Sequence, residues 1–143
     1  MIGFLDEASP QTTANTQRLW SSGHPTLIKN TTKFRANTFG FYSLNGCSVV
    51  EFHDHSKKED VCEFLQSIRN MNPDVDIVII RDNFRSHHAI ITQEFAETNR
   101  IKLVFLPPYS PDLNPIEYIW KSIRRIISHT FIQDSDHLKQ VIV

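Results

Sequence analysis

A chain of 143 residues with 40% hydrophobic side chains is long enough to form one domain with its own core. Its formal net charge of −1 excludes a strongly basic module that binds nucleic acid by overall charge alone. The sequence has no apolar run long enough to cross a membrane. Cys47 and Cys62 lack the spacing of a zinc site, so we expect free, buried or half-buried thiols in a reducing compartment.

The hydrophobic pattern predicts alternating strands and helices along most of the chain. A strand over residues 2–5 comes first, followed by a polar segment over 8–32 that is long for a loop and that Trp20 is expected to pin to the core. A hairpin of strands over 34–42 and 47–52 turns at Asn45-Gly46. Then come a helix over 57–70, a strand over 77–81, a helix over 86–99, a strand over 101–106 and helices over 115–128 and from 135 onward.

This order predicts an α/β fold with a mixed sheet flanked by helices. Residues 77–106 form a strand–helix–strand unit, whose two strands we expect to be parallel. The hairpin must then lie antiparallel in the same sheet. The sequence does not prove that the first strand pairs in parallel with strand 77–81.

Three carboxylates lie at the edges of these elements. Asp6 ends the first apolar run, Asp82 directly follows the run Ile77–Arg81, and Glu117 lies at the start of the helix that follows Asn114-Pro115. Ligands gather at the carboxyl ends of parallel strands, and oxygen donors suit divalent cations. We therefore expect a metal cage here, with Glu7 on the opposite face of its strand and exposed to solvent.

Two of these carboxylates, Asp82 and Glu117, also have a simpler interpretation. Asp82-Asn83 is a common turn-forming pair. Glu117 stands three residues after Asn114, where a capping box would bond its carboxylate back to the Asn114 amide. The local sequence favours neither role for Glu117 over the other.

The most unusual stretch has four prolines in ten residues, 106–115. It excludes a helix or a central strand and indicates a rigid connector, which would also fix the direction of Glu117. Basic residues cluster nearby: Lys121, Arg124 and Arg125 follow Glu117, and Arg81 and Arg85 bracket Asp82. Such a cluster is usually a solvated surface, but beside a carboxylate cage it could hold a phosphate backbone.

These residues together resemble a known family. Residues 106–120 read LPPYSPDLNPIEYIW and closely resemble the signature of DDE transposases of the mariner superfamily, in particular its bacterial and archaeal insertion-sequence branch. Asp82-Asn83 with His87 is similar to the second motif of that family, and the segment 4–7, followed by Trp20 and Gly23, is similar to the first. The thirty-four residues between Asp82 and Glu117 match the spacing in one part of the superfamily.

The resemblance implies a ribonuclease-H-like fold and an enzyme that cleaves DNA and transfers strands in cut-and-paste transposition. It implies that Asp6, Asp82 and Glu117 are catalytic and bind two Mg²⁺ or Mn²⁺ ions. Its partners would be the DNA of the element ends and of the target, with a homodimer left open and no membrane. We expect Asn83, His87, Lys121 and Arg124 to position phosphates.

The resemblance further implies a single catalytic domain over 1–143 without the N-terminal helix-turn-helix region of the family, in a cytoplasmic protein that associates with the nucleoid when it acts. Two alternatives remain. One is a hydrolytic nuclease of the same fold, because fold and triad do not determine the substrate. The other is a non-catalytic remnant that serves as a DNA scaffold or dimerisation module.

Overall fold

The computed structural model describes residues 1–13, 22–82, 90–108 and 110–143. Its centre is a five-stranded mixed sheet with the order β3-β2-β1-β4-β5. The strands are β1 (Ile2–Ala8), β2 (Thr38–Ser43), β3 (Val49–Phe52), β4 (Ile77–Arg81) and β5 (Ile101–Phe105). β1 pairs antiparallel with β2 and parallel with β4, and β4 pairs parallel with β5. The expected mixed sheet and its parallel unit are therefore confirmed.

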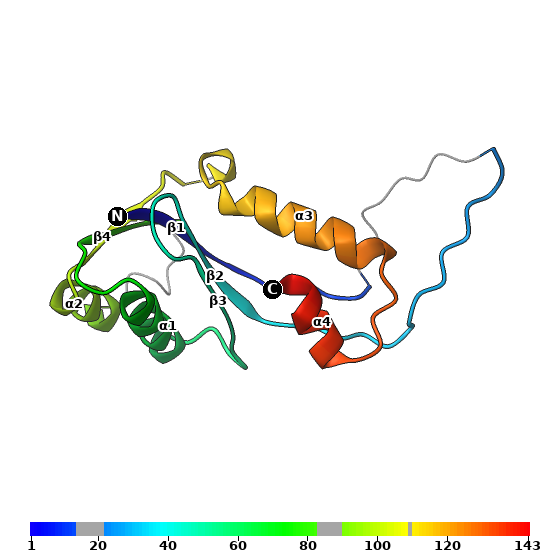
Figure 1. The fold of residues 1–143 in the computed structure, drawn as a ribbon, viewed down its shortest axis with the longest axis horizontal. Coiled ribbons are helices and arrows are strands. Elements are labelled where there is room, and N and C mark those ends of the chain that lie inside the picture. Colours follow the sequence, from blue (N-terminus) through cyan, green and yellow to red (C-terminus); the bar gives the residue numbers. More distant parts are fainter. Residues whose placement is uncertain (14–21, 83–89, 109) are drawn as a thin grey trace.

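Helices cover both faces of this sheet (Figure 1). α1 (Lys58–Met71) and α2 (Ile90–Thr98) lie on one face, and α3 (Ile116–His129) and α4 (Ser135–Ile142) lie on the other. Each face has its own hydrophobic cluster, so β1 is buried from both sides. None of the described helices is both long enough and apolar enough to span a bilayer.

Alternation along β1 decides which side chains reach which cluster. Leu5 is fully buried in the cluster of α1 and α2, whereas Phe4 and Ala8 pack against the cluster of α3 and α4. Asp6 has the same parity as Phe4, and its carboxylate contacts α3. The strand runs to Ala8 rather than ending at Leu5 as expected, because Asp6, Glu7 and Ala8 still pair with β2.

The helix α1 follows its prediction closely, while α2 does so only in part. Val61, Phe64, Leu65 and Ile68 are buried as the spacing predicts. In α2 the sequence places Ile90, Ile91, Phe95 and Ala96 inward. Ala96 is buried and Phe95 packs against the core, but Ile90 and Ile91 are 74% and 47% exposed. Ile90 and Ile91 therefore face solvent in the described part of α2.

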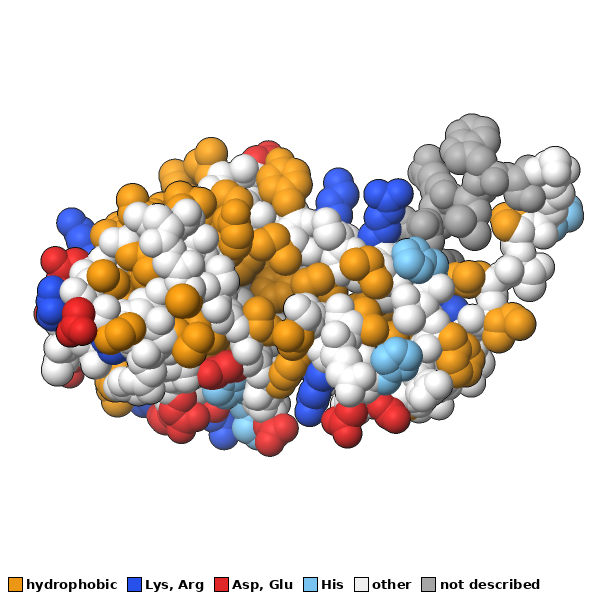
Figure 2. Space-filling view, viewed as in Figure 1, with side chains coloured by type: hydrophobic (Ala, Val, Ile, Leu, Met, Phe, Trp, Pro, Cys, Tyr) orange, Lys and Arg blue, Asp and Glu red, His pale blue; other side chains and the backbone are white. Residues whose placement is uncertain are grey.

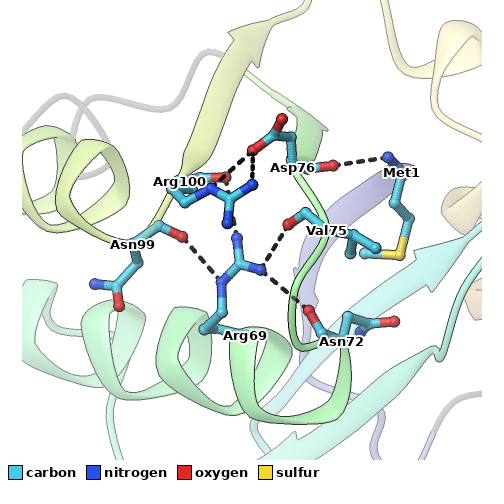
Figure 3. Close-up of polar contacts among 7 residues, drawn as sticks. All are labelled: Met1, Arg69, Asn72, Val75, Asp76, Asn99 and Arg100. Carbon is cyan, nitrogen blue, oxygen red and sulfur yellow. Dashed lines mark hydrogen bonds and ion pairs between the residues drawn. The ribbon is translucent and has the colours of Figure 1, made fainter.

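One arginine connects the ends of three elements near the start of β4 (Figure 3). Arg69, in the last turn of α1, donates hydrogen bonds to four backbone carbonyl groups. The acceptors belong to Asn72, Val75, Asn99 and Arg100. It thereby ties the loop before β4 to the turn between α2 and β5.

Candidate active site at the strand ends

Asp6 and Asp82 lie side by side where the parallel pairing of β1 and β4 ends. The register pairs Leu5 of β1 with Arg81 of β4, so the next residue on each strand is an aspartate. Because the two strands are parallel, alternation places both aspartates on the face that α3 covers. The pairing that the sequence could not prove is thus present, and it brings the two carboxylates together.

Glu117 approaches the same place from the first turn of α3. Its charge and that of Asp82 both raise the pKa of Asp6, which they can do only at short range. The three carboxylates of the predicted triad therefore converge, although they come from β1, from the end of β4 and from α3. Their catalytic and metal-binding roles remain predictions.

The capping-box interpretation of Glu117 is wrong. α3 starts at Ile116 with Pro115 as its N-cap and has no side-chain cap bond. A short 3₁₀ helix over Pro111–Leu113 ends at Asn114, whose amide is bonded to the Pro111 carbonyl at 2.9 Å. The Asn114 N–H therefore already has an acceptor and does not need the Glu117 carboxylate. Among the described residues, Oε2 of Glu117 instead lies 3.9 Å from Nη2 of Arg124.

The structure adds one polar partner for Asp6 that the sequence reasoning missed. Trp120, which is only 2% exposed, donates a hydrogen bond from Nε1 to Oδ2 of Asp6 at 3.0 Å. The sequence assigned this residue to the apolar face of its helix, where it does lie. The available signal was its position three residues after Glu117, on the turn that faces the same strand ends.

Burial and like charge together make Asp6 hard to ionise. Its pKa is raised from 3.8 to about 7, first by burial and then by Glu117 and Asp82, while bonds from the Glu7 backbone and from Trp120 oppose the rise. Mutual repulsion among three close carboxylates predicts that at least one of them takes up a proton more readily than a free acid does. The direction is confirmed, with burial as the larger cause.

A buried ion pair lies directly beneath this cluster. Arg81 is 1% exposed, and its Nη2 is 3.9 Å from Oε1 of Glu7. Burial lowers the pKa of Arg81 to about 10, while burial raises the pKa of Glu7. The expectation of a solvent-exposed Glu7 is therefore wrong, as is the idea that Arg81 could hold a phosphate, because alternation sends both side chains under the sheet.

The predicted phosphate contacts are only partly described. Asn83 and His87 lie outside the described residues. Lys121 is exposed on α3, and Arg124 is half-exposed and paired with Glu117. Figure 2 shows Lys and Arg side chains projecting from the α3 side of the molecule, where a polyanion could reach them.

A second group of metal-type ligands has a structural explanation. One ligand atom each of His53, Asp60 and Glu63 lies within 4.8 Å of the others. The seven histidines lack a zinc-type spacing, which predicts that most lie on the surface. The His53 ring, however, packs edge-on against Phe39 and bonds Glu51 at 3.2 Å. Asp60 accepts a bond from the Lys57 amide at the start of α1. These contacts account for two of the three side chains.

Comparison with known proteins gives a family match over nearly the whole chain. Residues 1–139 match the family model described as DDE superfamily endonuclease. An uncharacterised protein of Sinorhizobium fredii, y4pE/y4sA, is 33% identical over 82 residues, which cover 56% of this chain and 58% of that protein. The chain thus spans little more than half the length of this relative.

Several solved structures share the fold. The Mos1 transposase paired-end complex with the left transposon end superposes with a TM-score of 0.74 at 18% identity, covering 97% of this chain and 45% of that one. The catalytic domain of Mos1 mariner transposase gives 0.65 at 16% identity, with 97% and 66% covered. The five-stranded sheet with its flanking helices is therefore the ribonuclease-H-like fold that the sequence resemblance implied.

Proposed function

Because the chain belongs to the DDE superfamily endonucleases, we propose that it is the catalytic domain of a DNA transposase that cleaves DNA and joins strands in cut-and-paste transposition. The observation that carries the proposal is the convergence of Asp6, Asp82 and Glu117 at one end of the sheet. The similarity to Mos1 complexes with transposon-end DNA supports DNA as the substrate.

The donor set fits Mg²⁺ or Mn²⁺. Three carboxylates without cysteine or histidine favour hard cations, and the charge repulsion that raises the pKa of Asp6 is what a bound cation would relieve. Mos1 paired-end complexes with Mn and with Mg are among the similar structures. Two such ions, held by Asp6, Asp82 and Glu117, would activate a water or a DNA 3′-hydroxyl and stabilise the leaving oxygen.

The residues of the chain have separate tasks in this proposal. Asp6 must lose its proton to bind a cation, so the buried carboxyl group limits the activity at low pH. Glu117 must leave Arg124, whose ion pair at 3.9 Å is exposed and therefore weak. The released Arg124, with Lys121, Asn83 and His87, would then contact phosphate oxygens and orient the DNA strand for in-line attack.

The test compares Glu117→Gln with the parent chain on DNA. Supercoiled plasmid and Mn²⁺ report nicking, and a labelled duplex with a free 3′-hydroxyl reports strand joining. The near-neutral chain should capture DNA weakly, so we expect slow, sequence-tolerant nicking and joining by the parent chain. Glu117→Gln should lower the rates of both nicking and joining at least about 100-fold, because it removes a metal ligand.

Glu94→Gln is the matched control, since Glu94 is exposed on α2, across the sheet from α3. It should act like the parent chain. Equal nicking by the parent chain and Glu117→Gln would contradict the assignment of the site. Nicking without any joined product would favour the hydrolytic nuclease, and a folded parent chain that binds no Mn²⁺ would favour the non-catalytic remnant.

A further inference from the structure

The indole of Trp120 connects the first carboxylate of the triad to the helix that carries the third. Trp120 lies on the buried face of α3, three residues after Glu117, and is 2% exposed. Its Nε1 donates to Oδ2 of Asp6 at 3.0 Å. The indole N–H is the only hydrogen-bond donor of a tryptophan side chain, and here Asp6 accepts its bond.

A glycine in the sheet makes this position possible. Gly40 of β2 lies directly opposite Asp6 in the β1–β2 pairing. A Cβ atom at Gly40 would lie 2.7 Å from Cζ2 and 2.9 Å from Cη2 of Trp120, and 3.0 Å from Cδ1 of Ile116. Such distances are too short for any side chain. The indole therefore lies on bare backbone beside Asp6, and two elements together fix its place.

We propose that Trp120 is a positioning residue for Asp6, one whose N–H fixes one carboxylate oxygen so that the other faces a bound cation. This inference rests on the proposed function of Asp6 as a metal ligand. Outer partners of a ligand orient it, and their loss typically lowers metal affinity about 10- to 100-fold. Because the same helix carries Glu117, the contact also fixes the distance between the first and third carboxylates.

The first test measures Mn²⁺ affinity from the electron paramagnetic resonance of free Mn²⁺. Trp120→Phe keeps an aromatic ring on Gly40 but removes the donor, and we expect at least about tenfold weaker binding. Ile127→Val is the matched control, because Ile127 is buried in the same cluster of α3, seven residues further along. It should leave the affinity within about twofold. Equal losses in the two variants would reduce Trp120 to a packing residue.

Asp6→Asn separates this inference from the proposed function. If Asp6→Asn binds Mn²⁺ as the parent chain does, the metal site itself is wrong. If Asp6→Asn loses binding while Trp120→Phe retains it, only the positioning role is wrong. Thermal melting in EDTA shows whether each variant is folded before its affinity is compared.

The second test keeps the Trp120 side chain and so does not depend on the folding of Trp120→Phe. The sequence has two tryptophans, Trp20 and Trp120, and Trp20→Phe assigns the remaining indole N–H resonance in ¹⁵N-tryptophan-labelled protein. Substoichiometric Mn²⁺ should broaden this resonance, and Mg²⁺ should shift it. If Mn²⁺ binds in an Asp6-dependent way but leaves the resonance unchanged, the indole is not at the site and the inference fails.

Discussion

Ionisation of Asp6 works against folding at neutral pH when no cation is bound. In the unfolded chain the carboxyl group has an ordinary pKa of 3.8, and in the folded chain burial, Glu117 and Asp82 raise the pKa to about 7. The folded state therefore holds this proton more tightly. The stabilisation is fully present below about pH 4 and is lost as the pH rises through about 7.

This linkage predicts a pH-dependent effect of Asp6→Asn. The asparagine keeps an acceptor for Trp120 but never ionises, so it should raise the free energy of unfolding at pH 8 by roughly 2–4 kcal/mol. At pH 5 the folded carboxyl group is mostly protonated but the unfolded one is already ionised, so the gain should fall to roughly 1–2 kcal/mol. Urea denaturation in EDTA at both pH values measures the difference.

Asp54→Asn is the control for this prediction, because Asp54 is exposed and follows the edge strand β3, which β2 separates from β1. It should change stability by less than about 0.5 kcal/mol at either pH. A gain in Asp6→Asn that is equal at pH 5 and pH 8 would mean that charge is not the cause.

At the scale of single elements, Arg69 connects the loop before β4 to the turn between α2 and β5. Its guanidinium group is half-buried and bonds four carbonyl oxygens at 2.6–3.1 Å. These carbonyls belong to the loop before β4 and to the end of α2. Asp82 follows the other end of β4. Arg69 therefore anchors this strand at the end opposite the site.

Arg69→Met should therefore destabilise the fold by roughly 2–3 kcal/mol, because charge-assisted bonds are lost and their carbonyl acceptors lose a partner. Arg100→Met is the matched control. It removes a guanidinium group whose partner Asp76, 2.7 Å away, is largely exposed, and such pairs contribute less than about 1 kcal/mol. Urea denaturation should rank the two variants in this order, and similar losses would contradict the anchoring role.

The elements also show which signals in a sequence can be trusted. The positions of α1, β4 and β5 were predictable because each has a strong periodic pattern with clear ends. The inward face of α2 was predictable only in part, since nothing local reveals that Ile90 and Ile91 are exposed while Ala96 is buried. The role of Gly40 was equally hidden, because the close approach of Trp120 depends on a helix 80 residues away.

At the scale of the whole molecule, the site exists only in the folded chain. Asp6 and Asp82 meet because β1 pairs with β4, and Glu117 joins them because α3 packs over β1. The sequence could predict Asp82 at the end of a strand and Glu117 at the start of a helix, whereas Asp6 lies inside β1, which runs on to Ala8. It could not predict that Glu7 and Arg81 neutralise each other under the sheet, because that contact depends on the register of β1 against β4.

A cation that binds this site should therefore stabilise the entire domain. An unfolded chain separates the three carboxylates, so binding favours the folded state by mass action. At a concentration 100 times the dissociation constant, the gain is about 2.7 kcal/mol, which corresponds to roughly 8 °C in melting temperature for a chain of this size. Calorimetry with Mn²⁺ or Mg²⁺ measures the shift, with Ca²⁺ as a test of ion preference.

Asp82→Asn should remove most of this gain, because it takes away one of the three carboxylates proposed to hold the cation. Asp54→Asn, the same substitution at an exposed position away from the triad, should retain the full shift. An equal shift in Asp82→Asn and the parent chain would place the bound cation elsewhere, and the cluster of His53, Asp60 and Glu63 would then be the site to test. The melting experiment thus decides between the two groups of ligands that the fold brings together.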